Sequence, residues 1–204
     1  MILGIDEAGR GPVVGPLIVA GVLIEQKKER WLRKIDVKDS KKLSSKKREE
    51  IFEKMIGEKI RFRFIEIQPE QIDRFSLNYL EALASVEIIK QFYTKKIRAF
   101  VDVPAFGIGI ERYCARIKQS LKDLDVELIG GNKMDETNIV VSAASIVAKV
   151  IRDRKIKELQ KVYGDFGSGY PTKKTVSFIK HNYKKMEPIV RKKWSTIRRM
   201  NSGA

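Results

Sequence analysis

Apolar and polar positions divide the chain into segments of two kinds. Apolar runs, or apolar positions at every second residue, predict strands at residues 2–5, 13–24, 59–67, 97–103 and 126–130. Apolar residues at helical spacing predict helices at residues 27–34, 44–55, 76–93, 110–121 and 142–163, with a further helix starting at Pro69. The chain after the GDFGSGYP loop is helical and basic.

The order of these segments predicts an α/β fold. Three strands come early with tight or short connections, which favours antiparallel pairing. The later strands alternate with helices, which favours parallel pairing through crossovers. We therefore expect one mixed sheet with helices on both faces. A boundary at residues 164–171 separates residues 1–164 from a basic helical addition, residues 165–204.

Length and composition indicate a folded chain with a core of its own. The 204 residues are 43% hydrophobic and 33% charged, which is typical of a globular protein. The longest apolar stretch, VVGPLIVAGVLI, is interrupted by Pro16 and two glycines, so we expect neither a membrane span nor a signal peptide. The expected location is therefore cytoplasmic. The lone cysteine, Cys114, cannot form an internal disulfide and is expected half-buried on a helix.

The charge of the chain points to a polyanionic partner. Lys and Arg number 42 against 26 acids, a formal net charge of +16, and residues 184–199 carry seven of these cations against one acid. Such a surface attracts nucleic acid. A basic run is also often only a solvated face, so charge alone does not decide the function.

Acids within apolar strands are the second unusual feature. Asp6 closes the apolar segment MILGI and Asp102 lies inside AFVDV, while Asp135 precedes the long helix. Buried carboxylates need a cation or hydrogen bonds, and oxygen ligands suit Mg²⁺ or Mn²⁺. Two such ions roughly 4 Å apart hydrolyse phosphodiesters. The only histidine, His181, lies in a basic helix and is expected at the surface, which disfavours a Ser–His or Cys–His nucleophile.

The glycines after Asp6 do not form a dinucleotide-binding loop. Gly9, Gly11 and Gly15 do not fit G-x-G-x-x-G, and a strand with two prolines follows them instead of a helix. A dinucleotide site needs that helix N-terminus for the pyrophosphate. This function is therefore excluded.

Five ordered blocks closely resemble type 2 ribonuclease H, particularly the archaeal form. They are GIDEAGRGPVVGPLIVAGV, VKDSKKLS, the strand with Asp102, DETNIVVSAASIVAKVIRD and YGDFGSGYPT, and the match spans nearly the whole chain. The resemblance implies a ribonuclease-H-like sheet with a small C-terminal helical domain. It implies cleavage of RNA in RNA/DNA hybrids and incision 5′ to ribonucleotides in duplex DNA, leaving a 3′-hydroxyl, with a role in replication and repair.

The resemblance also implies roles for individual residues. Two Mg²⁺ or Mn²⁺ ions would be held by Asp6, Glu7, Asp102 and Asp135, with Asp6 touching both. The backbone of Gly9, Arg10 and Gly11 would read the ribose 2′-hydroxyl, and Tyr170 would pack beside the following sugar. Contacts to phosphates or support of the site would come from Lys41, Asn78, Ser142 and Lys149. From its position alone, Ser142 is also a plausible helix N-cap.

The chain departs from the family pattern in two places. Asn138 and Ile139 stand where the family usually has tyrosine and proline, so we expect a looser loop after Asp135. The last residues, RRMNSGA, lack the sliding-clamp motif that some relatives carry, and the family implies a monomer.

Two other functions stay open on the residues alone. A basic nucleic-acid-binding protein without activity explains the charge but not the acids on apolar strands. Another nuclease or integrase on the same fold would share the acids but would not need the Gly9–Arg10–Gly11 turn or Tyr170.

Overall fold

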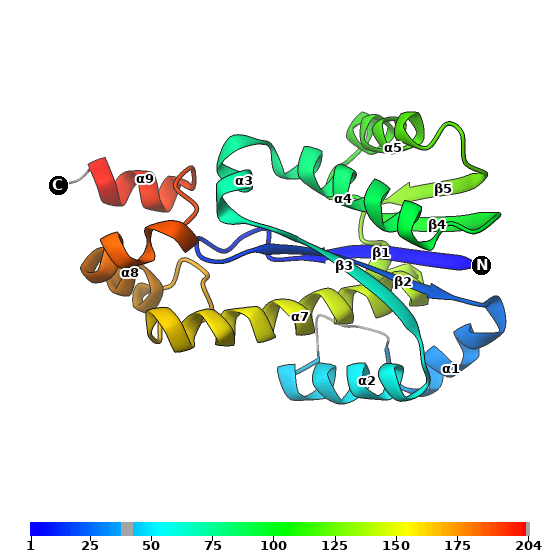
Figure 1. Cartoon of the computed structure of the whole chain (residues 1–204), viewed down its shortest axis with the longest axis horizontal. Helices are drawn as coiled ribbons and strands as arrows, with labels where there is room; N and C mark the ends of the chain where they lie inside the picture. Colours follow the sequence, from blue (N-terminus) through cyan, green and yellow to red (C-terminus); the bar gives the residue numbers. More distant parts are fainter. Residues whose placement is uncertain (38–42, 203–204) are drawn as a thin grey trace.

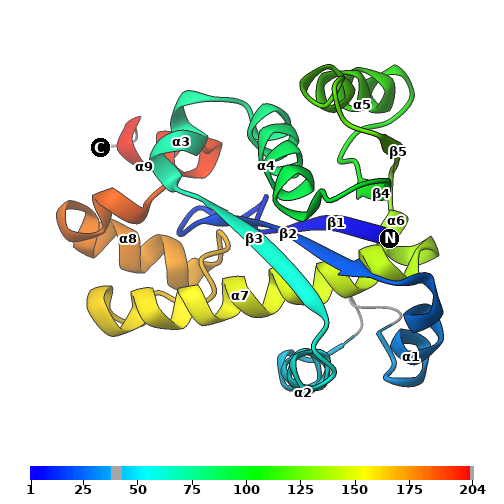
Figure 2. The same ribbon diagram turned by 45° about the vertical axis from the view of Figure 1, so that its right-hand side comes forward.

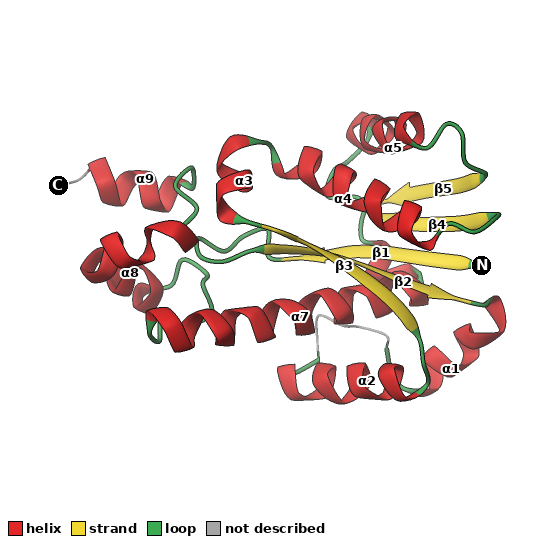
Figure 3. Ribbon diagram, viewed as in Figure 1, coloured by secondary structure: helices red, strands yellow, loops and turns green. Residues whose placement is uncertain are grey.

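The computed structural model describes residues 1–37 and 43–202, and its centre is one five-stranded sheet. The strand order is β3-β2-β1-β4-β5, as Figures 1 and 3 show. Antiparallel pairs join β1 to β2 and β2 to β3, and parallel pairs join β1 to β4 and β4 to β5. The predicted mixed sheet is confirmed. The strands are β1 (Ile2–Ala8), β2 (Leu17–Ile24), β3 (Arg61–Ile67), β4 (Ile97–Asp102) and β5 (Val126–Gly131).

Helices cover both faces of the sheet (Figures 1 and 2). One face packs against α3 (Pro69–Arg74), α4 (Leu77–Phe92) and α5 (Ile108–Ser120). The other packs against α1 (Glu29–Lys34), α2 (Ser45–Gly57) and the long α7 (Ile139–Tyr163). The remaining helices are η1 (Gln26–Lys28), α6 (Met134–Thr137), α8 (Lys173–Met186), η2 (Glu187–Ile189) and α9 (Ser195–Ser202).

Alternation along β1 decides which residues meet which helices. Leu3 and Ile5 are buried in the cluster that contains α4, and Ile2 and Ala8 in the cluster that contains α7. Successive side chains of a strand point to opposite faces. Asp6 is therefore on the α7 side of the sheet and Glu7 on the α4 side, a difference that matters for the site below.

The C-terminal segment packs against the connection between β1 and β2. Its buried residues, among them Phe166 and Ile179, form one cluster with Val13, Val14 and Ile156. Val14 also pairs with Val190 in an isolated β-bridge. The segment is therefore anchored beside the end of β1. The division into residues 1–164 and 165–204 stays a prediction.

Two predicted strand bounds are wrong near this anchor. The first strand continues to Ala8 instead of ending at Ile5, and the second begins at Leu17 instead of Val13. The reason is that the backbone of residues 13–15 pairs with the C-terminal segment: the amides of Val13 and Val14 donate to the Gly169 carbonyl. Hydrophobic pattern cannot distinguish such pairing from a strand of the sheet.

The start of α7 also differs from the prediction. The helix begins at Ile139, because the Asn138 side chain accepts hydrogen bonds from the Val140 and Val141 amides and is the N-cap. The proposed N-cap role of Ser142 is therefore wrong, since Ser142 lies inside the helix. The expected loose loop after Asp135 is instead the short α6, followed at once by this cap.

Three smaller expectations can be compared directly with the structure. Cys114 is half-buried on α5, and His181 is exposed with Nδ1 at 2.8 Å from the Ser177 carbonyl oxygen, both as predicted. None of the helices in the described ranges has the length and apolar character needed to cross a membrane.

The contact between β1 and α7 yields a stability prediction. A Cβ atom at Gly4 would lie 2.5 Å from the Val141 backbone nitrogen, and backbone cannot yield as a flexible side chain can. We expect Gly4→Ala to lower the free energy of unfolding by about 3 kcal/mol, measured by urea denaturation. The matched control is Gly57→Ala on α2, where an added Cβ meets nothing within 4 Å; this change should be neutral or stabilising. Equal effects of the two substitutions would contradict the tight packing.

Candidate active site

Three carboxylates converge where β1 and β4 end. Asp6, Glu7 and Asp102 each offer an oxygen atom, and the three atoms lie within 4.8 Å of one another. Asp6 is 5% exposed and the other two are half-buried. Like charges at this separation repel strongly out of water, so a bound cation would stabilise the ionised form of the cluster. An all-oxygen donor set of this kind fits Mg²⁺ or Mn²⁺.

Adjacent strand residues share this site because β1 loses one neighbour there. The parallel pairing of β1 with β4 ends at Ile5 and Val101, whereas the antiparallel pairing with β2 continues through Ala8. Beyond Ile5, the β4 side of β1 is therefore open. Asp6 approaches from the α7 face and Glu7 from the α4 face, and Asp102 follows Val101 at the end of β4. No break or end of β1 between the two acids is needed.

Hydrogen bonds from backbone amides and from α7 orient the Asp6 and Asp102 carboxylates. The Asp6 carboxylate accepts from the Glu7 backbone amide at 2.7 Å, and the Ser145 hydroxyl of α7 also hydrogen-bonds to Asp6. The Asp102 carboxylate accepts from the Met134 amide at 2.7 Å, at the start of α6. Ser145 in turn accepts from the Lys149 ammonium at 2.7 Å. These contacts fix the carboxylate positions without neutralising them.

Burial and mutual repulsion raise the pKa values of two of these acids. The pKa of Asp6 is raised well above its ordinary value, first by burial and then by the charges of Glu7 and Asp102. Burial raises the pKa of Glu7 from 4.5 to about 7, and the nearby Glu81 adds to this effect. Without a cation, the site thus holds protons near neutral pH.

Asp135 lies in α6 and is buried. It is not among the three acids whose oxygens lie within 4.8 Å of one another. Its helix is nevertheless tied to the site, because the amide of the preceding residue, Met134, donates to Asp102. The role of Asp135 as a fourth ligand stays a prediction.

The turn after the two acids is packed against a buried arginine. Gly9 has φ +107°, a conformation that favours glycine, and a Cβ there would lie 2.7 Å from Nε of Arg152. Arg152 itself is buried, donates to the Ser168 carbonyl at 3.2 Å and lies under the Tyr170 ring, 5.3 Å from its centroid. Only glycine fits at this position, because the Arg152 side chain occupies the space that a Cβ would need.

A buried acid of α4 holds the Arg10 side chain. The Arg10 guanidinium forms an ion pair with Glu81 and donates to the Asn78 side-chain oxygen at 2.9 Å. Glu81 is only 2% exposed, and burial raises its pKa although Arg10 opposes this. Asn78 is predicted to contact a substrate phosphate. In this structure its side-chain oxygen accepts a hydrogen bond from Arg10.

A second arginine, Arg191, holds the same turn from the C-terminal segment. Its side chain is fully buried, at 0% exposure. It donates to the carbonyls of Gly9 at 2.7 Å, Gly15 at 2.9 Å and Arg10 at 3.3 Å. Burial lowers the pKa of Arg191 to about 9, so the guanidinium stays charged at neutral pH. The turn is thus held through its carbonyls by a residue that lies 182 positions after Gly9.

Tyr170 borders the turn on its other side. The Tyr170 side chain is 45% exposed, and its ring lies 3.4 Å from where a Cβ of Gly11 would be. The structure therefore brings Tyr170 against the Gly9–Arg10–Gly11 turn that follows the two acids; the predicted roles of these residues in substrate binding stay predictions. An exposed ring on an arginine offers a flat surface that can pack against a sugar or base.

The other predicted contact residues have different surroundings. Ser142 is buried and donates to the Val37 carbonyl at 2.6 Å, so it supports the packing of α7 instead of facing a substrate. Lys149 is half-buried and donates to Ser145, which itself hydrogen-bonds to Asp6. Lys149 is therefore linked to Asp6 through Ser145. Lys41 lies outside the described residues.

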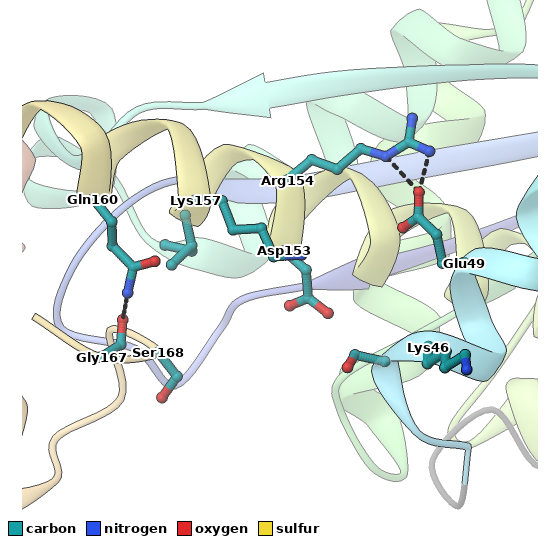
Figure 4. Close-up of a pocket in the computed structure, with 10 residues that line it drawn as sticks. Lys46, Glu49, Asp153, Arg154, Lys157, Gln160, Gly167 and Ser168 are labelled. Atoms are coloured by element: carbon teal, nitrogen blue, oxygen red, sulfur yellow. Dashed lines mark hydrogen bonds and ion pairs between the residues drawn. The ribbon is translucent and has the colours of Figure 1, made fainter. Parts of the chain in front are cut away.

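A groove of about 660 Å³ lies between α2, α7 and residues 167–168 (Figure 4), and none of the three acids lines it. Charged residues line it, but several are already paired. Arg154 forms ion pairs with Glu49 and Glu53, and Asp153 pairs with Arg48 at 3.1 Å. Because both of its acids and Arg154 are already paired, we assign no chemistry to this groove.

Comparison with known proteins places the chain in a family. The model of the family described as ribonuclease HII matches residues 3–197. The chain belongs to the ribonuclease HII family. Ribonuclease HII of Thermococcus sibiricus is 39% identical, with 97% of this chain and 89% of the relative aligned. That of Sulfolobus acidocaldarius is 42% identical over 97% of this chain and 92% of the relative.

Solved structures agree with this assignment. Ribonuclease H2 from Pyrococcus horikoshii matches with a TM-score of 0.88 and 38% identity over 99% of this chain and 97% of that one. A structure described as a PCNA:RNase HII complex from Archaeoglobus fulgidus matches with a TM-score of 0.83 and 37% identity, over 98% of this chain and 96% of that one. Ribonuclease HII enzymes are metal-dependent nucleases that cleave the RNA of RNA/DNA hybrids.

Sequence reasoning missed three residues of this ribonuclease HII site. Glu81 could have been found from the sequence, because it is an acid on the face of α4 that is otherwise apolar and buried. Arg152 and Arg191 lie in basic stretches, where nothing distinguishes a buried arginine from its exposed neighbours. Only the fold shows that they hold the turn.

The raised pKa values predict how stability depends on pH in the absence of metal. An unfolded Glu7 releases its proton near pH 4.5, but the folded one retains it to about pH 7. The folded state thus binds more protons in this window, so this group's contribution to stability falls as pH rises from 4.5 to 7. In EDTA, we expect Glu7→Gln to be more stable than the parent by on the order of 2 kcal/mol at pH 7.5 and equal to it near pH 4.

Denaturant titrations of both proteins across pH 4 to 8 measure this difference. Mn²⁺ should stabilise the parent more at pH 7.5 than at pH 5, since protons and metal compete for the same oxygens. A stability difference between the two proteins that does not change with pH would contradict the shifted pKa.

The contacts of Arg191 predict that a substitution which keeps its positive charge still lowers activity. Arg191→Lys keeps the cation but cannot reach three carbonyls, because an ammonium lacks the fork of a guanidinium. We expect RNA/DNA hybrid cleavage to fall at least about tenfold, the equivalent of ~1.4 kcal/mol in the barrier. Arg199→Lys on α9, where the side chain is exposed, should leave cleavage unchanged. Equal kcat/KM values for the two variants would show that Arg191 does not position the turn.

Proposed function

We propose that this chain is an endoribonuclease that also incises duplex DNA 5′ to single embedded ribonucleotides, leaving a 3′-hydroxyl. Its role would be the removal of ribonucleotides during DNA replication and repair. The observation that carries this proposal is the convergence of Asp6, Glu7 and Asp102 beside the Gly9–Arg10–Gly11 turn. Two of the three acids and a backbone able to recognise a sugar thus lie within six residues, Asp6 to Gly11.

Two Mg²⁺ or Mn²⁺ ions would be held by the three convergent acids, with Asp135 as a fourth ligand. When bound, such ions activate a water molecule and stabilise the leaving oxygen. The residues of this chain supply the positions: Ser145 hydrogen-bonds to Asp6, and the Met134 amide holds Asp102. Because these donors are fixed by the fold, the carboxylates are arranged before any ion binds.

Selection of RNA would depend on the turn and on Tyr170. The ribose 2′-hydroxyl distinguishes RNA from DNA at a given site, and a glycine turn lets it approach the backbone. Arg191 donates a hydrogen bond to the Gly9 carbonyl from inside the protein. The opposite side of the turn would therefore be the one that meets the sugar. Tyr170 would pack on the next sugar, and Asn78 and Lys149 would support contacts to phosphate.

The two alternative functions explain fewer observations. A basic binding protein without activity would gain nothing from three carboxylates that repel phosphate. Another nuclease of the same fold would share the acids, but the family match over residues 3–197 favours ribonuclease HII.

Three duplexes of equal length test the proposal: all DNA, DNA with one ribonucleotide, and a full RNA/DNA hybrid. We expect incision of the last two only, dependent on added Mg²⁺ or Mn²⁺, with the cut 5′ to the ribonucleotide. Equal cleavage of the all-DNA duplex, or none of the single-ribonucleotide duplex, would refute the specific activity.

Substitution of one acid tests its role as a ligand. Asp102→Asn should lower cleavage at least about 100-fold, or ~2.7 kcal/mol, while duplex binding without metal is retained because no cation is removed. Asp123→Asn, at an exposed position, is the matched control and should behave as the parent. A loss of less than about tenfold would exclude Asp102 as a ligand.

A further inference from the structure

A small cleft between α4 and α5 lies beside the candidate site. Its volume is about 210 Å³, and it is lined by Ser76, Asn78 and Tyr79 at the start of α4, Ala105, and Arg112 and Arg116 of α5, among others. None of its lining residues is acidic. We call this the α4–α5 cleft. Nothing in the reaction described above uses its two arginines.

The charges of the α4–α5 cleft are not neutralised from within. In the part of the chain that the structure describes, neither Arg112 nor Arg116 forms an ion pair. Arg154, in the groove of Figure 4, differs because two glutamates pair with it. The start of α4, capped by Ser76, adds the positive end of a helix dipole to the same cleft.

Arg116 is also held in place. Its guanidinium lies 5.0 Å from the centroid of the Tyr79 ring, and stacking of this kind leaves the N–H groups at the edge of the guanidinium plane for a ligand. Phe106, on the loop between β4 and α5, is 77% exposed. A cationic cleft with an exposed aromatic residue nearby fits a sugar–phosphate strand better than a free anion.

The position of the cleft relates it to the reaction. Asn78 lines it and also accepts from Arg10, and Ala105 lies only three residues after Asp102. Tyr170 lies on the other side of the turn, near the C-terminal segment that contains α8. Figures 1 and 2 show α8 and α5 at opposite sides of the molecule. A strand that passes from Tyr170 over the acids can therefore reach the α4–α5 cleft.

We propose that the α4–α5 cleft binds a backbone phosphate of the nucleic-acid substrate, on the side of the acids away from Tyr170. Arg112 and Arg116 neutralise this phosphate, and the first turn of α4 contributes amide and side-chain donors. The proposal rests on the proposed function, because it takes the substrate to be a duplex that crosses the three acids.

The experiment combines a double variant with single-phosphate neutralisation. The variant is Arg112→Ala with Arg116→Ala, and its control is Arg30→Ala with Arg33→Ala on α1, which removes the same charge far from the site. The ligand is a DNA duplex with one ribonucleotide, in which one phosphate at a time is replaced by an uncharged methylphosphonate. Affinity is measured in EDTA, and cleavage is measured separately with Mn²⁺.

We expect the parent to lose affinity about tenfold when one phosphate on a single side of the ribonucleotide is neutralised. The double variant should bind the unmodified duplex about tenfold more weakly. Neutralising the same phosphate should not change its affinity further. The slope of its log affinity against log salt concentration should be smaller in magnitude by roughly one to two. Its kcat at saturating substrate should stay within about twofold of the parent value. The α1 control should show the parent's profile at every phosphate.

Other outcomes separate the two proposals. If the double variant keeps the parent's affinity and methylphosphonate profile, the cleft is not a phosphate site, and an acidic protein partner becomes the better candidate for it. If the parent fails to incise the single-ribonucleotide duplex but the affinity pattern holds, the specific activity is refuted while the cleft stands as a nucleic-acid contact.

Discussion

The constraint on which this structure depends is the cost of keeping three carboxylates together away from water. Asp6, Glu7 and Asp102 would separate if their strands could move, because the three carboxylates repel one another and burial opposes the charged forms of Asp6 and Glu7. The fold prevents this by carrying them on two parallel neighbouring strands at the centre of the sheet. Packing of the sheet against α4 and α7 therefore maintains a charge arrangement that is unfavourable until a cation binds.

The same constraint explains why the acids lie where β1 and β4 stop pairing. Adjacent residues of a strand point to opposite faces, so Asp6 meets Ser145 of α7 while Glu7 lies near Glu81 of α4. Their carboxylates can meet only beyond the edge of the β1–β4 ladder, where no neighbouring backbone intervenes. Thus α7 contacts the site at Asp6, and α4 contacts it at Glu7. A shift of either helix would therefore move the acid that it contacts.

Much of this arrangement could be predicted from the sequence. The order of strands and helices predicted the mixed sheet, and acids in apolar segments predicted the site, because both follow from local pattern. The pairing of residues 13–15 with the C-terminal segment and the burial of Arg191 could not be predicted. Each depends on contacts between distant residues, and an arginine in a basic stretch has the same pattern whether it is buried or exposed.

The distribution of charge joins the site to its surroundings. A net charge of +16 attracts nucleic acid over the whole surface, but many cations are already paired with acids, as Arg154 and Arg48 are. Cations that are held in place without an acid retain their full attraction for phosphate. Arg116, stacked on Tyr79, meets this condition on the surface, and Arg112 lines the same cleft. Arg152 and Arg191 are buried and hold the turn instead. General attraction therefore concentrates the substrate at the protein, and on our proposal Arg112 and Arg116 set where along the surface the strand comes to lie.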